Sequence, residues 1–297
     1  MKILFCTDGS DISLYAVEKA LTFIKKDFEI DIVTVTETSF LNTFITFPYE
    51  TEEGFPEYKN AAEKLLEKTA NFIESKNFKV GEKIQLNGYP ADVILDLIQK
   101  GNYSAVILGS RGKKGFINRL GSVSRKITNK SHIPVLIVKP VRNHEMPQEH
   151  KKILSAVDGS LNSYNAIKKA QEIIDFDAGS VEILTVKASP EDFPVEIRDD
   201  KEWLERCLSK QDEIMKEILE KTSKILEENN IKLEKKTLLQ GDPAEEILKY
   251  TVKNRKDLII MGSHGREGLS SFILGSVCKI VLDNTDTPVL IIYNKPV

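Results

Sequence analysis

The chain has 297 residues, a length that predicts about two domains. Its formal net charge is −3, which argues against nucleic acid as a partner, because proteins that bind phosphate backbones usually carry a basic balance or patch. The sequence holds no apolar run of about 18 residues, so we expect neither a membrane span nor a membrane partner.

The cysteines point to a reducing compartment. Cys6, Cys207 and Cys278 are odd in number and widely separated, so they form neither a disulfide framework nor a zinc-binding spacing. The N-terminal residues read directly as a strand, without the cleavage region of a signal peptide. We therefore expect the protein in the cytoplasm.

One pattern occurs twice in the sequence. Five segments of the first half recur in the same order and in nearly constant register in the second: 2–10 and 152–160, 86–91 and 239–244, 109–112 and 262–265, 121–123 and 275–277, and 133–138 and 287–292. A repeat of this kind indicates a duplicated domain. We expect one domain over 1–140 and another over 151–297, joined by a polar linker with Pro140 and Pro147.

In chain order, each half alternates predicted strands and helices. Apolar runs predict strands at 3–7, 30–36, 104–108 and 135–138, and again at 153–157, 181–186, 258–261 and 289–292, with one further strand before each Gly-x-Pro turn. Helices are expected after the first strand, over 91–100 and 244–253, and before the last strand. Such alternation predicts an α/β fold with a five-stranded parallel sheet and helices on both faces.

Two parts of each half read differently. The segments 38–58 and 188–200, rich in acids, prolines and aromatics, read as irregular chain. Each precedes a long amphipathic helix, whose apolar stripe is typical of a helix packed on a sheet. The second of these helices is predicted over 201–230 and is longer than the first, so binding of a partner to its surface remains an alternative.

The stretch 261–278 has the order strand, glycine-rich loop, helix start. It carries Gly262, Gly265, Gly268 and Gly275, and an apolar pattern at helical spacing follows. The first N–H groups of a helix lack partners and favour anions, and glycines let the backbone approach a phosphate closely. The alternative is a tight connection whose glycines only serve turns. In parallel sheets ligands bind at the carboxyl ends of strands, so this loop and the Asp-Gly-Ser after the first strand are expected to face one pocket.

These motifs together resemble the universal stress proteins. They are Asp-Gly-Ser after the first strand, Gly-Asp-Pro before the third helix, and Gly-x-x-Gly, nine residues, then Gly-Ser, and they cover nearly the whole chain in two copies. The resemblance implies two Rossmann-like domains, of the adenine nucleotide alpha hydrolase type, in a cytoplasmic stress-response protein. It implies ATP, ADP or AMP as ligand, with or without Mg²⁺. It further implies pairing of the two halves within the chain and leaves a homodimer open.

Carried over to the second half, the resemblance assigns a nucleotide site. Gly262 and Gly265 would approach the ribose and phosphates, and the start of the last helix would offer N–H groups to the phosphates. The full set is Ala156, Val157, Asp158, Val186, Met261, Gly262, His264, Gly265, Gly275, Ser276, Val277 and Cys278. Cys278 stands where the family usually has Ser or Thr, which removes a hydroxyl donor.

The first half departs from the pattern, because eight residues rather than nine separate Gly112 from Gly121. This shortening shifts the path of the loop, so the resemblance places ATP chiefly in the second half. The corresponding residues of the first half are Thr7, Asp8, Val35, Gly109, Gly112, Gly121, Ser122, Val123 and Ser124.

The sequence leaves the chemistry open. His264 reads as a loop-shaping or a catalytic residue, while Asp8 and Asp158 read as ribose or Mg²⁺ ligands or as helix caps. A P-loop motif is absent, and no residues are placed as a catalytic triad. The leading hypothesis is a regulatory ATP-binding protein; the alternatives are a slow Mg²⁺-dependent ATPase and a nucleotide-free interaction module.

Overall fold

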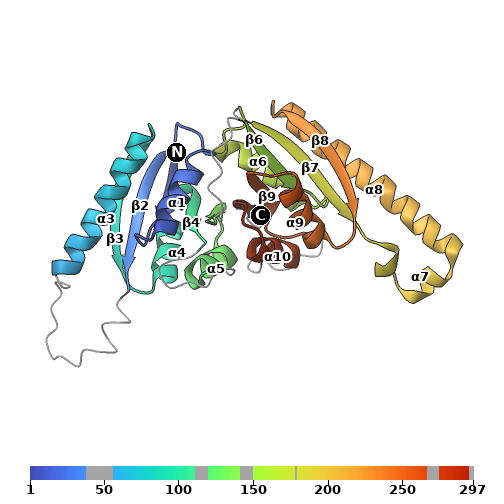
Figure 1. Ribbon diagram of the computed structural model, residues 1–297, viewed down its shortest axis with the longest axis horizontal. Helices are drawn as coiled ribbons and strands as arrows, with labels where there is room; N and C mark the ends of the chain where they lie inside the picture. The colour runs from blue at the N-terminus through green and yellow to red at the C-terminus, as the bar shows by residue number, and fades with distance from the viewer. Residues whose placement is uncertain (38–55, 111–119, 141–149, 178, 266–273, 294–297) are drawn as a thin grey trace, which may run out of the picture. The chain divides into compact units, whose positions relative to one another are not determined.

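The computed structural model describes residues 1–37, 56–110, 120–140, 150–177, 179–265 and 274–293, with the backbone alone for 56–59. The chain divides into two compact units, Met1–Pro140 and Val141–Val297. Each is an α/β unit with a parallel five-stranded sheet, which confirms the predicted fold class (Figure 1). In the described part of the chain, no helix has both the length and the apolar character needed to cross a membrane.

Unit 1 runs through nine elements in the described residues. They are β1 (Lys2–Cys6), α1 (Asp11–Ala20), β2 (Glu29–Thr36), α3 (Pro56–Ser75), β3 (Lys79–Asn87), α4 (Pro90–Lys100), β4 (Tyr103–Gly109), α5 (Ser122–Lys130) and β5 (Val135–Val138). The strand order is β3-β2-β1-β4-β5. Helices α1 and α3 contact one another on one face of the sheet, and α4 and α5 do so on the other.

Unit 2 repeats this plan with one addition. Its elements are β6 (Lys151–Ala156), α6 (Leu161–Ile173), β7 (Gly179–Lys187), a 3-10 turn (Pro190–Asp192), α7 (Val195–Asp199), α8 (Lys201–Glu228), β8 (Leu233–Gln240), α9 (Pro243–Lys253), β9 (Leu258–Gly262), α10 (Ser276–Asn284) and β10 (Val289–Ile292). The strand order is β8-β7-β6-β9-β10. The segment 188–200, expected to be irregular, thus contains a 3-10 turn and a short helix. Ser189 and Asp192 form a capping box around the turn.

The core of each unit follows from the central strands. β1 and β6 lie between two neighbouring strands and under helices on both faces, so nearly all their apolar side chains are buried, as in Phe5 and Leu154. Phe5, Phe23 and Phe28 are among the largest fully buried side chains. Because β1 and β6 pair with β2 and β7 on one side and with β4 and β9 on the other, the strand order reverses there. Ligand sites in such sheets lie at this reversal, beyond the carboxyl ends of the strands.

Candidate functional site

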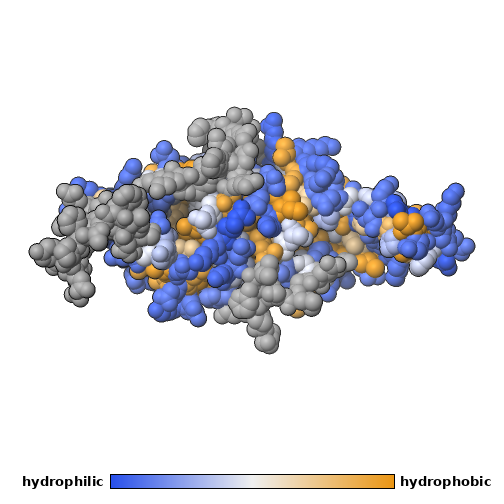
Figure 2. All heavy atoms as spheres, turned by 90° about the horizontal axis from the view of Figure 1, so that it is seen from below, coloured by the Kyte–Doolittle hydropathy of each residue, from blue (hydrophilic) through white to orange (hydrophobic). Residues whose placement is uncertain are grey.

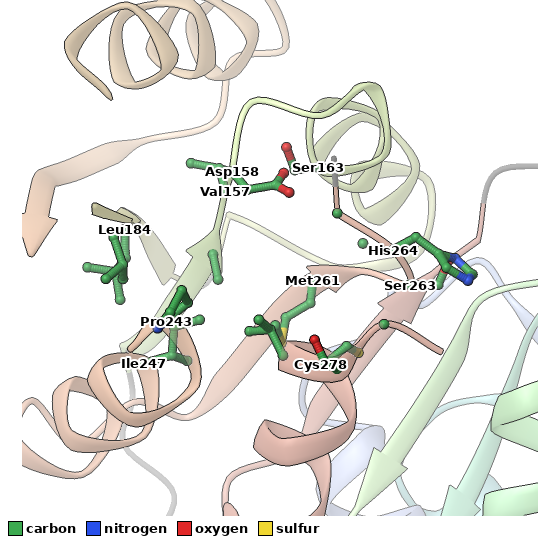
Figure 3. A pocket seen from close by; sticks show the side chains of 17 residues that line it. Val157, Asp158, Ser163, Leu184, Pro243, Ile247, Met261, Ser263, His264 and Cys278 are labelled. Carbon is green, nitrogen blue, oxygen red and sulfur yellow. The ribbon is translucent and has the colours of Figure 1, made fainter. Parts of the chain in front are cut away.

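A cavity of about 470 Å³ lies at the carboxyl ends of β6, β7 and β9 in unit 2 (Figure 3). Every residue that the sequence assigns to the second-half site lines it: Ala156, Val157, Asp158, Val186, Met261, Gly262, His264, Gly265, Gly275, Ser276, Val277 and Cys278. They come from four separate segments, so the fold brings together residues more than a hundred positions apart.

Five lining residues were missed by the sequence analysis: Ser163, Leu184, Pro243, Ile247 and Ser263. Leu184 precedes Val186 by two residues and shares its face of β7, so the period of a strand could have identified it. Pro243 and Ile247 are four residues apart on α9, which is the spacing of one helical face. No pattern in the sequence indicates that this face of α9 covers the end of β7.

The turn after β6 is fixed by side-chain hydrogen bonds. Asp158 Oδ1 accepts from the Ser160 backbone N–H (3.0 Å) and from Ser160 Oγ (2.6 Å). Ser160 Oγ in turn accepts from the Ser163 N–H (3.1 Å), so Ser160 is the N-cap of α6. Gly159 has φ +82°, a left-handed conformation that glycine adopts without strain. The cap of α6 is therefore Ser160 rather than Asp158, and Asp158 orients it.

The glycine loop passes directly against Asp158. A Cβ built on Gly265 would lie 2.6 Å from Asp158 Oδ2, closer than atoms can approach without a shift. The far end of the loop is tied back by the Gly275 N–H, which donates to the Ser263 carbonyl (2.8 Å). Gly268 lies outside the described residues. The loop thus brings peptide groups and a carboxylate to the same wall of the cavity.

Helix α10 begins at this wall, with Gly275 at its N-cap position. Among the described residues no side chain caps the helix, and its first turn carries no acidic residue. The first N–H groups of a helix have no partners within it, and the helix dipole adds a positive potential at this end. The start of α10, with Ser276, Val277 and Cys278, can therefore attract an anion from inside the cavity.

Cys278 is a buried thiol at the third position of α10. Burial raises its pKa to about 12, so the group stays protonated at neutral pH. The hydroxyl at the matching position of unit 1, Ser124 Oγ, donates to the Gly109 carbonyl (2.7 Å). A hydroxyl at this position can thus form its hydrogen bond within the protein, so a cysteine in its place does not imply the loss of a ligand contact.

His264 does not face the centre of the cavity. Its Nδ1 lies 2.9 Å from Ser263 Oγ, and its ring is directed away from Asp158 and Met261 (Figure 3). Burial lowers the pKa of the imidazole, which is therefore neutral at pH 7. Among the described residues no three His, Cys, Asp or Glu side chains are grouped to hold a metal ion. This arrangement agrees with a loop-shaping His264.

The sequence profile described as "Universal stress protein family" matches residues 1–139 and again 149–292. The chain belongs to this family. The tandem arrangement is also that of universal stress protein Slr1230 from Synechocystis sp., which is 27% identical over 97% of this chain and 98% of its own length. Universal stress protein MJ0531 from Methanocaldococcus jannaschii is 37% identical over 52% of this chain and 88% of its own length.

A solved universal stress protein has the same fold over the whole chain. The crystal structure of the protein from Archaeoglobus fulgidus covers 99% of this chain and 98% of its own, with a TM-score of 0.67 and 24% identity. At this identity the likeness establishes the Rossmann-like fold of the universal stress protein units and nothing about a ligand.

The universal stress protein unit formed by residues 1–140 has its matching residues in corresponding places. Thr7 and Asp8 follow β1, Val35 lies on β2, Gly109 ends β4, and Gly121, Ser122, Val123 and Ser124 begin α5. Asp8 Oδ1 accepts from the Ser10 N–H (3.0 Å) and Oγ (2.6 Å), as Asp158 does in unit 2. Gly112 lies outside the described residues, so the one-residue shortening of this loop has no structural description.

Proposed function

We propose that unit 2 binds one adenine nucleotide, ATP or its products ADP and AMP, and that the protein acts as a nucleotide-dependent regulator rather than a fast enzyme. One observation carries the proposal. A single cavity connects the uncapped start of α10 to an apolar slot between β7 and α9. A nucleotide has the same two ends, a phosphate anion and a flat base.

The phosphate end of the cavity rests on backbone groups. A Cβ at Gly262, Gly265 or Gly275 would meet protein atoms at 3.1, 2.6 and 3.3 Å, so these glycines let the loop and the start of α10 pack closely around the cavity. The lining contains no lysine or arginine among the described residues. The anion would thus be held by the N–H groups of Ser276 and Val277 and by the dipole of α10.

The base end is apolar and offers one backbone edge. Val157, Leu184, Val186, Ile247 and Met261 surround it. The Leu184 carbonyl accepts from the Val157 N–H (2.9 Å), and alternate residues of a strand direct their backbone groups to the same side. The N–H and C=O of Val186 therefore point past the end of β6, toward the slot. This donor and acceptor match the N1 and the amino group of adenine, whereas guanine presents the reverse pattern there.

The wall between the two ends suits a ribose. Asp158 is the only carboxylate among the described lining residues, and it lies against Gly265. A carboxylate accepts hydrogen bonds from vicinal hydroxyls. If Mg²⁺ accompanies the nucleotide, Asp158 is the side chain that would contact it. Mg²⁺ commonly takes one or two carboxylates together with substrate phosphates and water.

The same wall favours binding over rapid turnover. Asp158 already holds Ser160, and the ring of His264 is turned away, so neither side chain is arranged as a general base toward the phosphate end. A stress-response protein that binds a nucleotide without consuming it can report nucleotide levels to a partner through the occupancy of this site.

Calorimetric titration with ATP and Mg²⁺ tests the proposal. We expect about one site per chain in the wild type. Gly275→Val should lower the affinity by at least about 100-fold, because a Cβ at this position would already lie 3.3 Å from the Ser263 carbonyl and a valine would displace the loop from the start of α10. Gly121→Val places the same change at the matching position of unit 1 and should leave the binding unchanged. Absence of heat with the wild-type protein would overturn the proposal, as would loss of binding in Gly121→Val alone.

A further inference from the structure

The base end of the cavity is covered by helix α9. Pro243 and Ile247 on this helix line the slot together with Leu184 on β7 (Figure 3). The outer side of α9 is charged, and its Lys249 and Glu245 side chains form an exposed ion pair of 3.2 Å. Figure 2 shows that polar side chains of this kind make up most of the described surface on one face of the molecule. Exposed pairs contribute little to stability, so the buried side of α9 determines where the helix lies.

One turn beyond Ile247, Tyr250 connects α9 to the sheet. Its side chain is buried, and its hydroxyl donates to Glu182 Oε2 on β7 (2.6 Å). The same hydroxyl lies 3.1 Å from Thr237 Oγ1 on β8. Hydrogen bonds to a charged acceptor are stronger than those between neutral groups. A single side chain thus joins the helix to two neighbouring strands.

The chain that follows α9 leads to the same carboxylate. The Lys256 side chain is 1% exposed and forms an ion pair with Glu182. The Lys256 N–H donates to the Thr251 carbonyl in the last turn of the helix (3.0 Å). Glu182 is therefore bonded to Tyr250 within α9 and to Lys256 just beyond its end. We call these two contacts the α9 anchor.

The α9 anchor and the slot lie on one face of β7. Glu182, Leu184 and Val186 are alternate residues of the strand, so their side chains lie on the same side of the sheet. The anchor is about 7 Å along the strand from the slot, since two residues of a strand span this distance. Neither Glu182 nor Tyr250 lines the cavity. The anchor can therefore fix the position of α9 without touching a ligand.

Unit 1 has no such anchor among its described residues. Apolar residues, Leu97 on α4 and Ile84 on β3, stand at the positions of the tyrosine and the threonine, so no side-chain hydrogen bond can form there. Asp31 is the counterpart of Glu182, and its hydrogen-bond donors lie on β1, β3 and β4. The carboxylate thus holds strands together in unit 1, whereas it holds a helix to the sheet in unit 2.

From this contrast we infer that Tyr250 is a positioning residue for the nucleotide base. Through the α9 anchor it holds Ile247 at the distance from Leu184 that a flat base requires. The inference rests on the proposed nucleotide site. Without the hydroxyl of Tyr250, α9 would take several positions, and only a fraction of the molecules would present a slot of the right width. The affinity for the ligand falls by that fraction when the binding-competent state is only partly populated.

Tyr250→Phe tests the inference, because it removes the hydroxyl and keeps the ring in the core. Calorimetry measures the affinity for AMP, and competition against AMP measures the affinity for ribose 5-phosphate, which has no base. AMP should bind about tenfold more weakly, the change expected for one hydrogen bond to a charged group. Ribose 5-phosphate should bind as it does to the wild type, within about twofold, because its contacts lie at Asp158 and at the start of α10.

Tyr103→Phe is the matched control. It removes the hydroxyl that donates to the buried Asp31 carboxylate in unit 1, whereas the cavity is lined by unit 2, so it should change neither affinity. Amide hydrogen exchange of the ligand-free protein gives a second readout. Residues 244–249 should exchange faster in Tyr250→Phe, while β7 keeps its protection.

Equal losses of affinity for AMP and ribose 5-phosphate would overturn the inference, since the variant would then act on the whole site. An unchanged affinity for AMP, or unchanged exchange of residues 244–249, would overturn it as well. A wild-type protein that binds no AMP would overturn the proposed function, and the inference with it.

Discussion

The turns after β1 and β6 have the same backbone and different side-chain chemistry. In unit 1, Thr7 Oγ1 lies 3.0 Å from Ser13 Oγ and accepts from the Gly9 N–H (3.2 Å). In unit 2, Val157 stands at the position of Thr7 and contributes an apolar surface to the cavity. The hydroxyl that bonds within unit 1 therefore has an apolar side chain of the cavity lining as its counterpart in unit 2.

The space above the two turns also differs in what fills it. In unit 1, the side chain of Leu65 on α3 packs on Gly9, within 3.1 Å of a Cβ built there. In unit 2, Gly265 lies against Asp158 at the edge of an open cavity. The two units thus share one topology but differ in the side chains around the turn after the first strand.

A second contrast lies inside the two sheets, at matching positions on β2 and β7. Asp31 bonds to Lys2 Nζ (2.9 Å), Tyr103 OH (3.1 Å) and the Glu82 N–H (2.8 Å). Glu182 instead pairs with Lys256 and accepts from Tyr250 OH (2.6 Å). The Lys256 side chain is 1% exposed, whereas that of Lys2 is 36% exposed. Both carboxylates are thus buried, but the cation of the pair is also buried in unit 2, whereas solvent reaches it in unit 1.

The largest effect is predicted for a variant that breaks the Glu182–Lys256 ion pair. Lys256→Met should destabilise unit 2 by about 3–5 kcal/mol, because it leaves the Glu182 carboxylate buried without its cation. Lys2→Met should cost unit 1 less, because Asp31, although buried, keeps two other donors and solvent reaches the position of the Lys2 ammonium. Amide hydrogen exchange read by mass spectrometry reports each unit separately. Equal losses in both units would contradict the contrast.

The next effect concerns the apolar slot. Val186→Trp should weaken ATP binding by about 100-fold, because the indole fills the space proposed for the base. Val35→Trp makes the same change at the matching position on β2 and should leave the affinity as it is. Calorimetry measures both variants. An unchanged affinity in Val186→Trp would place the base somewhere else.

The two ion pairs also predict opposite responses to pH. Burial pushes the pKa of Glu182 upward, but the Lys256 ammonium and the Tyr250 hydroxyl outweigh burial and hold that pKa below 4.5. Glu182 therefore stabilises unit 2 above pH 4.5, and this contribution is lost as the pH falls below that value. The hydrogen bond to Asp31 raises the pKa of Lys2 above 10.5, so its contribution to unit 1 is lost at higher pH.

Amide hydrogen exchange across the pH range, corrected for intrinsic rates, tests whether unit 2 is destabilised by acid and unit 1 by alkali. Unit 2 should lose protection first on the acid side, and Glu182→Gln should flatten that loss. Unit 1 should show the smaller effect, on the alkaline side, because Lys2 is partly solvated. Acid sensitivity that remains undiminished in Glu182→Gln would assign it to other carboxylates.

The smallest effect is expected at the start of α10. Cys278→Ser restores the hydroxyl found in unit 1, where Ser124 Oγ donates to the Gly109 carbonyl. The new hydroxyl should bond to the matching carbonyl of Gly262 rather than to a ligand, so the dissociation constant for ATP should change by less than about threefold. A tenfold gain in affinity would show that this position contacts the phosphates directly.

Much of the fold followed from patterns that act over short distances. Apolar runs and the repeat predicted the strands, and β5 and β10 have the predicted bounds, Val135–Val138 and Val289–Ile292. The grouping of residues around the cavity could be anticipated because carboxyl ends of parallel strands meet at one edge. The part of the lining that α9 contributes, including Ile247, was not predicted, since the packing of α9 over β7 depends on contacts distant in sequence.

Other features could be recognised only in the three-dimensional structure. Glu182 and Lys256 are 74 positions apart, and no local pattern pairs them. The choice between Asp158 and Ser160 as cap depended on turn geometry that both residue types allow. The direction of the His264 ring is likewise set by Ser263 and by packing rather than by the glycine pattern. These are the details that decide between a binding site and a catalytic one.

Nucleotide binding by unit 2 can be measured directly by denaturing the purified protein and quantifying the released nucleotides by mass spectrometry. We expect about one adenine nucleotide per chain, retained in Gly121→Val and lost in Gly275→Val. Two nucleotides per chain would contradict the assignment to unit 2 alone. None, followed by no heat on titration with ATP and Mg²⁺, would contradict nucleotide binding itself.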